Sequence, residues 1–587
     1  MSNRGGGRKQ DDIWAYFKKS VTPGKTGSRA TCRSCNKEIQ GLVKRMKDHF
    51  EVCEGNKNRA SVGGCSQPTL VFSSQPTAPV DSLEPISPPP TPAEQMRPVF
   101  SFSSEGSVPK STKKQKISES VAKYFTKTTE IEKKALDHQV AKTIFATNSS
   151  FSFAEHPEFI KLCSMLRPGY HPPSRKVVGS TLLDEVYDES YASCKEKVKG
   201  KAVSMELDGW SNIHQEPIVC CSITTFKGDH FLTTTIDTED ERHTGDNLEI
   251  IAEKAIKEVE KKLECKVTSF VTDNASNMKK CRSQLQDSLP IITYPCSAHV
   301  LDRVAKDVDN SSIKSDIVTI AKYFRNHHLP NAWYKQEGGQ KLQIPCDVRW
   351  NSVSDCLQSY IKNWPALVRV VEAHRDEIAQ HIYEKVLDME LKHQAIDYHS
   401  KMELIAIALD KLQSNTCHLS DAVVIWKELQ EKFETLPIID LVKFESRMKT
   451  ALTPAHLLAY LLDPRYIGSS LLNNEEISTA MNYLSEHQPS ALPTVLQYRS
   501  KSPPFESYMF SSELVKNVDP LTWWKSQESL LNEDTLSLVE QLHTARASTA
   551  GIERVFSTFG FVHSKIRNRL HTDKASKLVF MYKLFNM

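Results

Sequence analysis

The 587-residue chain lacks any uninterrupted apolar run of the roughly 18 residues that a membrane-spanning helix needs. Its first residues, MSNRGGGRKQ, are polar and contain no apolar core of a secretory signal. From these two absences we expect a protein that is neither secreted nor embedded in a membrane. Its fourteen cysteines are then reduced thiols or metal ligands, because a disulfide framework needs an oxidising compartment.

The chain also lacks an internal repeat of fixed period, which argues against a solenoid or a propeller. Its length exceeds what one hydrophobic core supports, so we expect at least two folded units. The charge is unevenly distributed: residues 1–60 hold fourteen Lys or Arg and six Asp or Glu, whereas the whole chain has a net charge of +3. A basic N-terminal module on a mildly acidic body indicates a polyanionic partner.

The stretch TCRSCNKEIQGLVKRMKDHFEVC has the ligand spacing of a metal site. Cys32 and Cys35 bracket a tight turn, and the helical period of the following residues places His49 and Cys53 one turn apart on one face. Four such ligands complete a tetrahedral Zn²⁺ site, and zinc would supply the folding energy that so small a module lacks. The less favoured alternative is a set of unrelated free cysteines and a surface histidine.

The module also has aromatic residues ahead of the Cys pair, in DDIWAYFKK. With the closing His and Cys it resembles a BED-type zinc finger, a DNA-binding module of chromatin proteins and transposases. Lys44, Arg45 and Lys47 on the closing helix are then candidate contacts to double-stranded DNA. A merely solvated helix face is the alternative for each of them.

Residues 57–117 are rich in Pro and Ser and show no helical or strand period, which predicts a disordered linker. The cluster KSTKKQK at residues 110–116 is typical of a nuclear import signal, or else of a solvated charge run. We expect the protein in the nucleus.

Beyond the linker, apolar residues at helical spacing predict helices over 118–199. The stretches AVSMELDGWSN, PIVCCSITTF and HFLTTTID then read as strands, followed by a helix at 247–264 and a further strand, KVTSFVTDNASN. This order predicts a mixed α/β sheet. Helical sequence returns from about 355, and the tail from 535 reads as two helices separated near Gly560. Asp208 and Asp273 emerge at strand ends, where two carboxylates can clamp a divalent cation, although such residues are also common turn-formers.

Eight sequence motifs occur in this order along this part of the chain: FATNSSFSFAEHPEFIKLCSMLRPGYHPPSR, LDGWSN, FVTDNASNM, PCSAHVLD, PCDVRWNS, LLDPRY, DPLTWWKS and ASTAGIERVFSTFG. Together they resemble the hAT superfamily of DNA transposases and the host proteins derived from them, over about residues 118–587. The resemblance implies a ribonuclease H-like domain that is interrupted by a helical insertion and closes with a dimerisation segment.

The resemblance implies that Asp208, Asp273 and Glu553 correspond to the three catalytic acids of the family. Three carboxylates of this kind hold two Mg²⁺ ions for an in-line phosphoryl displacement, with Asp208 bridging both ions.

Two further pairs match family words. Cys296 and His299 in PCSAH are expected to support the active-site residues or to position DNA, with packing in the core as the alternative. Arg349 and Trp350 in DVRWNS are expected to contact DNA beside the scissile strand, with core packing as the alternative.

The expected fold class is therefore α/β plus α. The expected parts are a disordered basic N-terminus (1–10), a zinc finger (11–56), a disordered linker (57–117), a helical region (118–199), a ribonuclease H-like core (200–354), an all-helical insertion (355–535) and a C-terminal dimerisation segment (536–587). The apolar final helix can pack on its own domain, but the resemblance favours a homodimer or higher oligomer through this segment.

Two functions are carried forward. The first is a nuclear, zinc-dependent, sequence-specific DNA-binding protein with an intact acid triad for Mg²⁺-dependent strand cleavage and transfer. The second is a domesticated, catalytically silent regulator of transcription or chromatin. A ribonuclease on the same fold ranks last, because it needs neither the finger nor the dimer segment.

Overall fold

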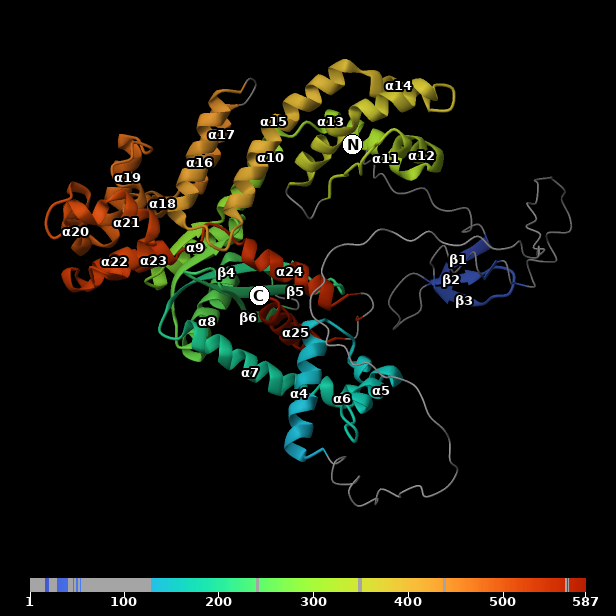
Figure 1. Ribbon diagram of the computed structural model, residues 1–587, viewed down its shortest axis with the longest axis horizontal. Coiled ribbons are helices and arrows are strands. Elements are labelled where there is room, and N and C mark those ends of the chain that lie inside the picture. Colours follow the sequence, from blue (N-terminus) through green and yellow to red (C-terminus); the bar gives the residue numbers. More distant parts are fainter. Residues whose placement is uncertain are drawn as a thin grey trace, which may run out of the picture. The chain divides into compact units, whose positions relative to one another are not determined.

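A computed structural model of the protein describes residues 16–20, 29–40, 46, 49–50, 53, 128–238, 242–346, 351–436, 440–564, 567 and 570–587. The chain divides into two compact units, Met1–Thr112 and Lys113–Met587 (Figure 1). The expected N-terminal tail and linker, and the expected DNA contacts Lys44, Arg45, Lys47, Arg349 and Trp350, lie outside the described residues and stay predictions.

The first unit contains a small antiparallel sheet in the order β1-β2-β3 (Phe17–Ser20, Arg29–Cys32, Glu38–Gln40). Among the described residues, its core consists of Phe17, Ala30, Cys32, Met46 and Cys53, with Phe50 packed against them. Two of these core residues are expected metal ligands.

The second unit is built on a five-stranded sheet in the order β6-β5-β4-β7-β8. The strands are β4 (Ala202–Ser211), β5 (Pro217–Thr225), β6 (His230–Asp237), β7 (Lys266–Thr272) and β8 (Ile292–Pro295). β4 pairs antiparallel with β5 and parallel with β7, and β7 pairs parallel with β8. The expected mixed sheet is confirmed. The sequence analysis missed β8, because four residues are too few to show a period.

The expected helix at 247–264 is confirmed as α8 (Gly245–Leu263) after β6, and a second helix, α9 (Ser276–Ser288), which was not predicted, lies between β7 and β8. A helical crossover returns the chain to the same end of a parallel neighbour. The carboxyl ends of β4, β7 and β8 therefore lie at one edge of the sheet, where ligands of such sheets usually bind.

Helices from both ends of the unit pack on this sheet: α4 (Glu130–Ala146), α7 (Thr181–Val198), α24 (Ala550–Val562) and α25 (Thr572–Phe585). The chain between α4 and α7 forms η2 (Phe151–Glu155), α5 (Pro157–Leu166) and α6 (Arg175–Val178). α25 contacts α4, α7 and β6, and buries Leu578, Val579 and Met581 in the sheet core. The final helix thus packs on its own domain, and these three side chains are not available to a second subunit.

The tail has the expected break near Gly560, because α24 ends at Val562 and α25 begins at Thr572. It differs from the expectation in the segment before the break, which forms two helices, α23 (Glu533–Thr544) and α24, where one was expected.

The remaining helices form a second hydrophobic core. They are α10 (Ser297–Val308), α11 (Ser311–Asn326), α12 (His328–Gln336), α13 (Ser352–Ala373), α14 (Gln380–Leu387), α15 (Met389–Leu412), α16 (Leu419–Glu434), α17 (Leu441–Ala451), α18 (Pro454–Leu461), α19 (Asn474–His487), α20 (Leu492–Ser500), α21 (Ser512–Asn517) and α22 (Pro520–Lys525). The helices α10, α11 and α12, which precede the expected start of the insertion at residue 355, also belong to this core. α10 contacts both α15 and α17, so it joins the sheet edge to this helical part.

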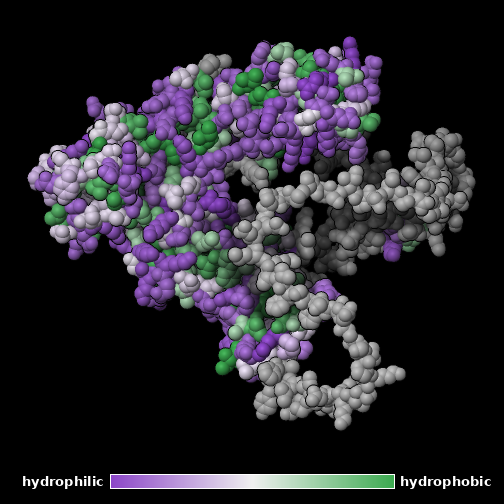
Figure 2. All heavy atoms as spheres, viewed as in Figure 1, coloured by the Kyte–Doolittle hydropathy of each residue, from purple (hydrophilic) through white to green (hydrophobic). Residues whose placement is uncertain are grey.

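Hydrophilic residues cover most of the visible surface of the second unit in Figure 2, with hydrophobic residues scattered among them. None of the described helices is both long enough and apolar enough to cross a membrane.

Candidate metal centre and acid cluster

The first unit gathers the four predicted zinc ligands. Cys35 Sγ lies 3.3 Å from His49 Nε2, and Cys32 Sγ lies 3.9 Å from Cys53 Sγ. All four ligand atoms lie within 4.8 Å of one another. Three sulfurs and one imidazole nitrogen at this spacing could bind zinc.

Cys32 has the electrostatic character of a metal ligand. Burial raises its pKa, but hydrogen bonds from the backbone N–H groups of Ser34 and Cys35 and from the His49 ring outweigh burial and lower it to about 6. A thiolate is the form that ligates a metal, so the local backbone prepares this sulfur for the ion.

In the second unit, the strand register brings two of the predicted acids together. Glu206 of β4 lies opposite Val271 of the parallel strand β7. Two residues further along each strand are Asp208 and Asp273, so both acids lie at the carboxyl edge of the sheet. Each is half-buried.

α24 delivers the third acid, Glu553, to the same edge. The backbone N–H of Ile552 donates to Glu206 Oε2 at 3.0 Å, which attaches the first turn of α24 to β4. Gly551 permits this approach, because a Cβ there would lie 2.6 Å from His230 Nε2 and 2.7 Å from Glu206 Oε2. Glu553 therefore lies beside Asp208 although the two are far apart in sequence.

The carboxylate of Glu206 is itself fully enclosed. Glu206 and His230 are each 2% exposed, with 3.4 Å between Glu206 Oε2 and His230 Nε2, and the Thr224 hydroxyl donates to Glu206 Oε1 at 2.7 Å. Burial raises the pKa of Glu206, but His230 and Thr224 outweigh it and hold the pKa below its usual range. Burial lowers the pKa of His230. Glu206 is therefore the charged partner, and its charge is stabilised at the N-terminus of α24.

The acids of the cluster repel one another. Burial, with the negative charges of Asp273 and Glu206, raises the pKa of Asp208 to about 6 against the opposing effect of His299. Burial, with the charge of Asp208, raises the pKa of Glu553 to about 7. Crowded carboxylates with raised pKa values gain from a nearby cation.

His299, in the first turn of α10, is one such cation. Its Nε2 lies 3.4 Å from Glu553 Oε1. Burial would lower its pKa, but Cys296, Glu553 and Asp208 around it raise the pKa to about 10. His299 is therefore protonated at neutral pH and balances part of the negative charge of the cluster.

Cys296 is completely buried and has a structural contact. Its Sγ accepts a hydrogen bond from the backbone N–H of Thr549 at 3.3 Å, and Thr549 is the N-cap of α24. Cys296 is thus packed in the core, whereas His299 contacts Glu553.

The acid cluster fits Mg²⁺ in its donor type. Carboxylate oxygens are the ligands that this hard cation prefers, and the raised pKa values of Asp208 and Glu553 show that negative charge is concentrated here. The acids are more widely spaced than the finger ligands. Among the described residues, the finger provides the only group of three or more Cys, His, Asp or Glu side chains that is close enough to bind one ion.

Sequence reasoning missed Glu206, His230 and Gly551. One signal was present: a glutamate in the middle of the otherwise apolar strand AVSMEL must find a partner when it is buried. The partner on β6 and the close approach of α24 depend on the tertiary fold and leave no local pattern.

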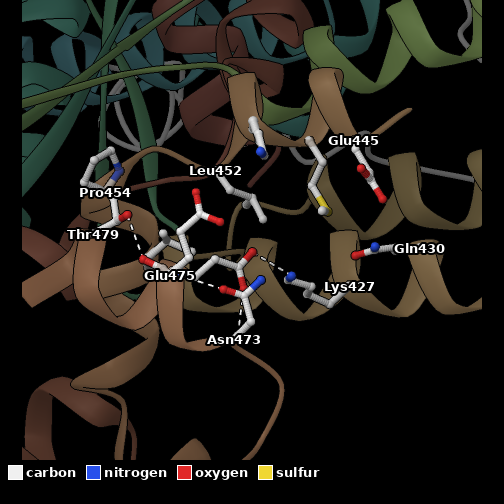
Figure 3. Close-up of a pocket in the computed structure, with 12 residues that line it drawn as sticks. Lys427, Gln430, Glu445, Leu452, Pro454, Asn473, Glu475 and Thr479 are labelled. Atoms are coloured by element: carbon white, nitrogen blue, oxygen red, sulfur yellow. Dashed lines mark hydrogen bonds and ion pairs between the residues drawn. The ribbon is translucent and has the colours of Figure 1, made fainter. Parts of the chain in front are cut away.

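A separate cavity of about 380 Å³ lies among α16, α17, α18 and α19 (Figure 3). Its charges are mixed, and Lys427 Nζ pairs with Glu476 Oε1 at 2.7 Å. This cavity contains none of the acids of the cluster.

Two regions of the chain match models of known protein families. Residues 173–324 match a domain of unknown function, DUF659, and residues 497–585 match the hAT family C-terminal dimerisation region. The first match contains Asp208, Asp273 and His299, and the second contains Glu553. A search of the curated proteins found no match. The chain therefore contains a region similar to the hAT family C-terminal dimerisation region, which points to self-association.

Proposed function

We propose that the protein is a nuclear, dimeric, sequence-specific DNA-binding protein related to hAT transposases. In this proposal the second unit has a ribonuclease H-like fold and its acid cluster catalyses Mg²⁺-dependent cleavage and transfer of DNA strands. The finger, as a zinc-bound BED-type module, selects the DNA. The observation that carries the proposal is the meeting of Asp208, Asp273 and Glu553, from three distant segments, at the carboxyl edge of one sheet.

In this proposal Asp208, Asp273 and Glu553 hold the metal. Bound Mg²⁺ would activate the attacking oxygen and stabilise the leaving oxygen of the phosphodiester. The residues around the acids keep them in place: Glu206 fixes the first turn of α24 on β4, and Cys296 binds the N-cap residue Thr549. His299 holds a proton next to Glu553 and balances charge at the edge of the cluster.

The test is strand cleavage by the purified protein, with Mg²⁺ or Mn²⁺, on DNA from both flanks of its own gene. Asp208→Asn should bind this DNA and fold normally but yield no nicked or hairpin product. Asp287→Asn is the matched control, since Asp287 is exposed on α9, away from the cluster. Equal cleavage by Asp208→Asn and the wild type would refute the triad.

A specific observation also favours the second candidate, a catalytically silent regulator. His299 already pairs with Glu553, so the cluster is electrostatically viable as a purely structural feature of the fold. DNA binding without cleavage by the wild type, on correctly chosen ends, would support this candidate.

A further inference from the structure

A cavity of about 850 Å³ lies between the chain around η2 and α6 and the chain that joins α24 to α25. Its lining includes four cationic side chains, those of Arg175, Lys176, Arg567 and Lys574. Among the described residues, no Asp or Glu lines it. We call it the basic pocket.

Within the described part of the chain, the contacts of Arg567 are to neutral groups. Its guanidinium donates to the Asn148 side-chain oxygen and to the Ser149 carbonyl, and it lies 5.8 Å from the centre of the Phe151 ring. Burial lowers its pKa. A half-buried guanidinium with no carboxylate partner among the described residues, at the wall of an open cavity, is a favourable position for an anion.

Lys176 and Lys574 add positive charges to the pocket, and neither has an ion-pair partner among the described residues. Lys574 Nζ donates to the Gly179 carbonyl at 2.7 Å, and Lys176 is exposed and forms no ion pair within the described part of the chain. Arg175 has a carboxylate beside it, with its Nε 3.6 Å from Glu155 Oε2, and it is 62% exposed. The lining therefore has a net positive charge.

Two other cavities of this unit differ from the basic pocket, because acidic side chains line them together with cationic or neutral ones. In the cavity of Figure 3 the cation Lys427 is paired with Glu476. A neighbouring cavity shares Leu570 and His571 with the basic pocket, but Glu216, Asp237 and Asp573 line it. Leu570 and His571 thus separate a basic from an acidic cavity, and an anion would enter only the basic one.

The chain links this pocket to the acid cluster. α24 rises roughly 14 Å from Glu553 to Val562 at about 1.5 Å per residue. The five residues from there to Arg567 add at most about 17 Å. The pocket therefore lies within about one turn, ~34 Å, of duplex DNA from the candidate active site.

We propose that the basic pocket binds a backbone phosphate of the DNA on which the acid cluster acts. Arginine forks match phosphate oxygens, lysines act as point charges, and Phe151 and Leu570 offer apolar contact to a sugar or base. The choice of DNA as ligand rests on the proposed function.

The experiment measures DNA affinity of the full-length, zinc-loaded protein as a function of salt. The probe is a labelled duplex of mixed sequence, about three helical turns long. Each lost phosphate contact reduces the slope of log affinity against log salt by about 0.9. Lys176→Gln should lower the slope by about one, and Lys176→Gln with Lys574→Gln by about two. Lys254→Gln, at an exposed lysine on α8 without an ion pair in the described region, should leave it unchanged.

Slopes equal to that of the wild type in both variants would overturn the proposal. So would protection by inorganic phosphate against thermal unfolding without any change in slope, because the pocket would then bind free phosphate only. Lys176→Gln removes no described contact, so a failure to fold does not obscure its result. The outcome is independent of cleavage: an active Asp208→Asn would refute the triad and leave the slopes as they are.

Discussion

The two units of this protein each assemble a group of potential metal ligands, but in opposite ways. In the first unit Cys32, Cys35, His49 and Cys53 are close in sequence, and two of them belong to the small core that the described residues form. In the second unit Asp208, Asp273 and Glu553 come from distant segments, and a large core positions them whether or not an ion binds. We expect a bound metal ion to stabilise the fold of the first unit. In the second unit, the packed core holds the acids in position.

This difference sets the expected consequences of damage. A structural zinc site contributes about 10–16 kcal/mol of binding free energy to folding, so its loss removes the fold of the unit. The acids of the second unit repel one another, so removing one of them should not weaken the fold.

The largest expected effect is the loss of zinc. Cys32→Ser should abolish the bound zinc and unfold the first unit, and with it specific DNA binding. The thermal transition of the second unit should not change, because no zinc ligand of the finger belongs to its core. Metal content per chain and DNA binding measure the two effects.

Cys346→Ser is the matched control, because Cys346 is exposed and belongs to no ligand group in the described residues. One zinc per chain in Cys32→Ser would contradict the assignment.

The second prediction tests whether α25 supports the fold of the second unit. Leu578→Ala should lower the free energy of unfolding by about 2–5 kcal/mol, because Leu578 is buried in the sheet core. Chemical denaturation measures the change. Ile131→Ala is the control, since Ile131 is 85% exposed and its truncation should alter stability by about 0.5 kcal/mol or less. A monomeric but equally stable Leu578→Ala variant would instead place this side chain at a subunit contact.

The smallest predicted effect concerns two glycines of one helix. Gly551→Ala should cost about 1–3 kcal/mol, because its Cβ would collide with His230 and Glu206. Gly560→Ala should stabilise by about 0.5–1 kcal/mol, because Gly560 is exposed and its Cβ would have no neighbour within 4 Å. The midpoints of urea unfolding measure both. Equal shifts in the two variants would show that α24 does not approach β4 as closely as described.

More of the site could be predicted from the sequence in the first unit than in the second. The finger ligands were predictable because a turn and one helical step fix their geometry, and the structure brings all four together. The order of strands and helices through β7 was also readable from periodicity. The short strand β8 and the separation of α23 from α24 were not, because four residues show no period and the chain between these two helices has no strong breaker.

The tertiary structure decided what local pattern could not. It enclosed Glu206 with His230 and the first turn of α24, and it placed the apolar face of α25 in its own core. Both outcomes depend on which distant surfaces meet. The sequence by itself indicated the Cys and His cluster of the first unit and the mixed sheet, because short-range geometry and periodicity encode them. Only the fold decided that the acids lie together, since the register of β4 on β7 and the seating of α24 are set by long-range packing.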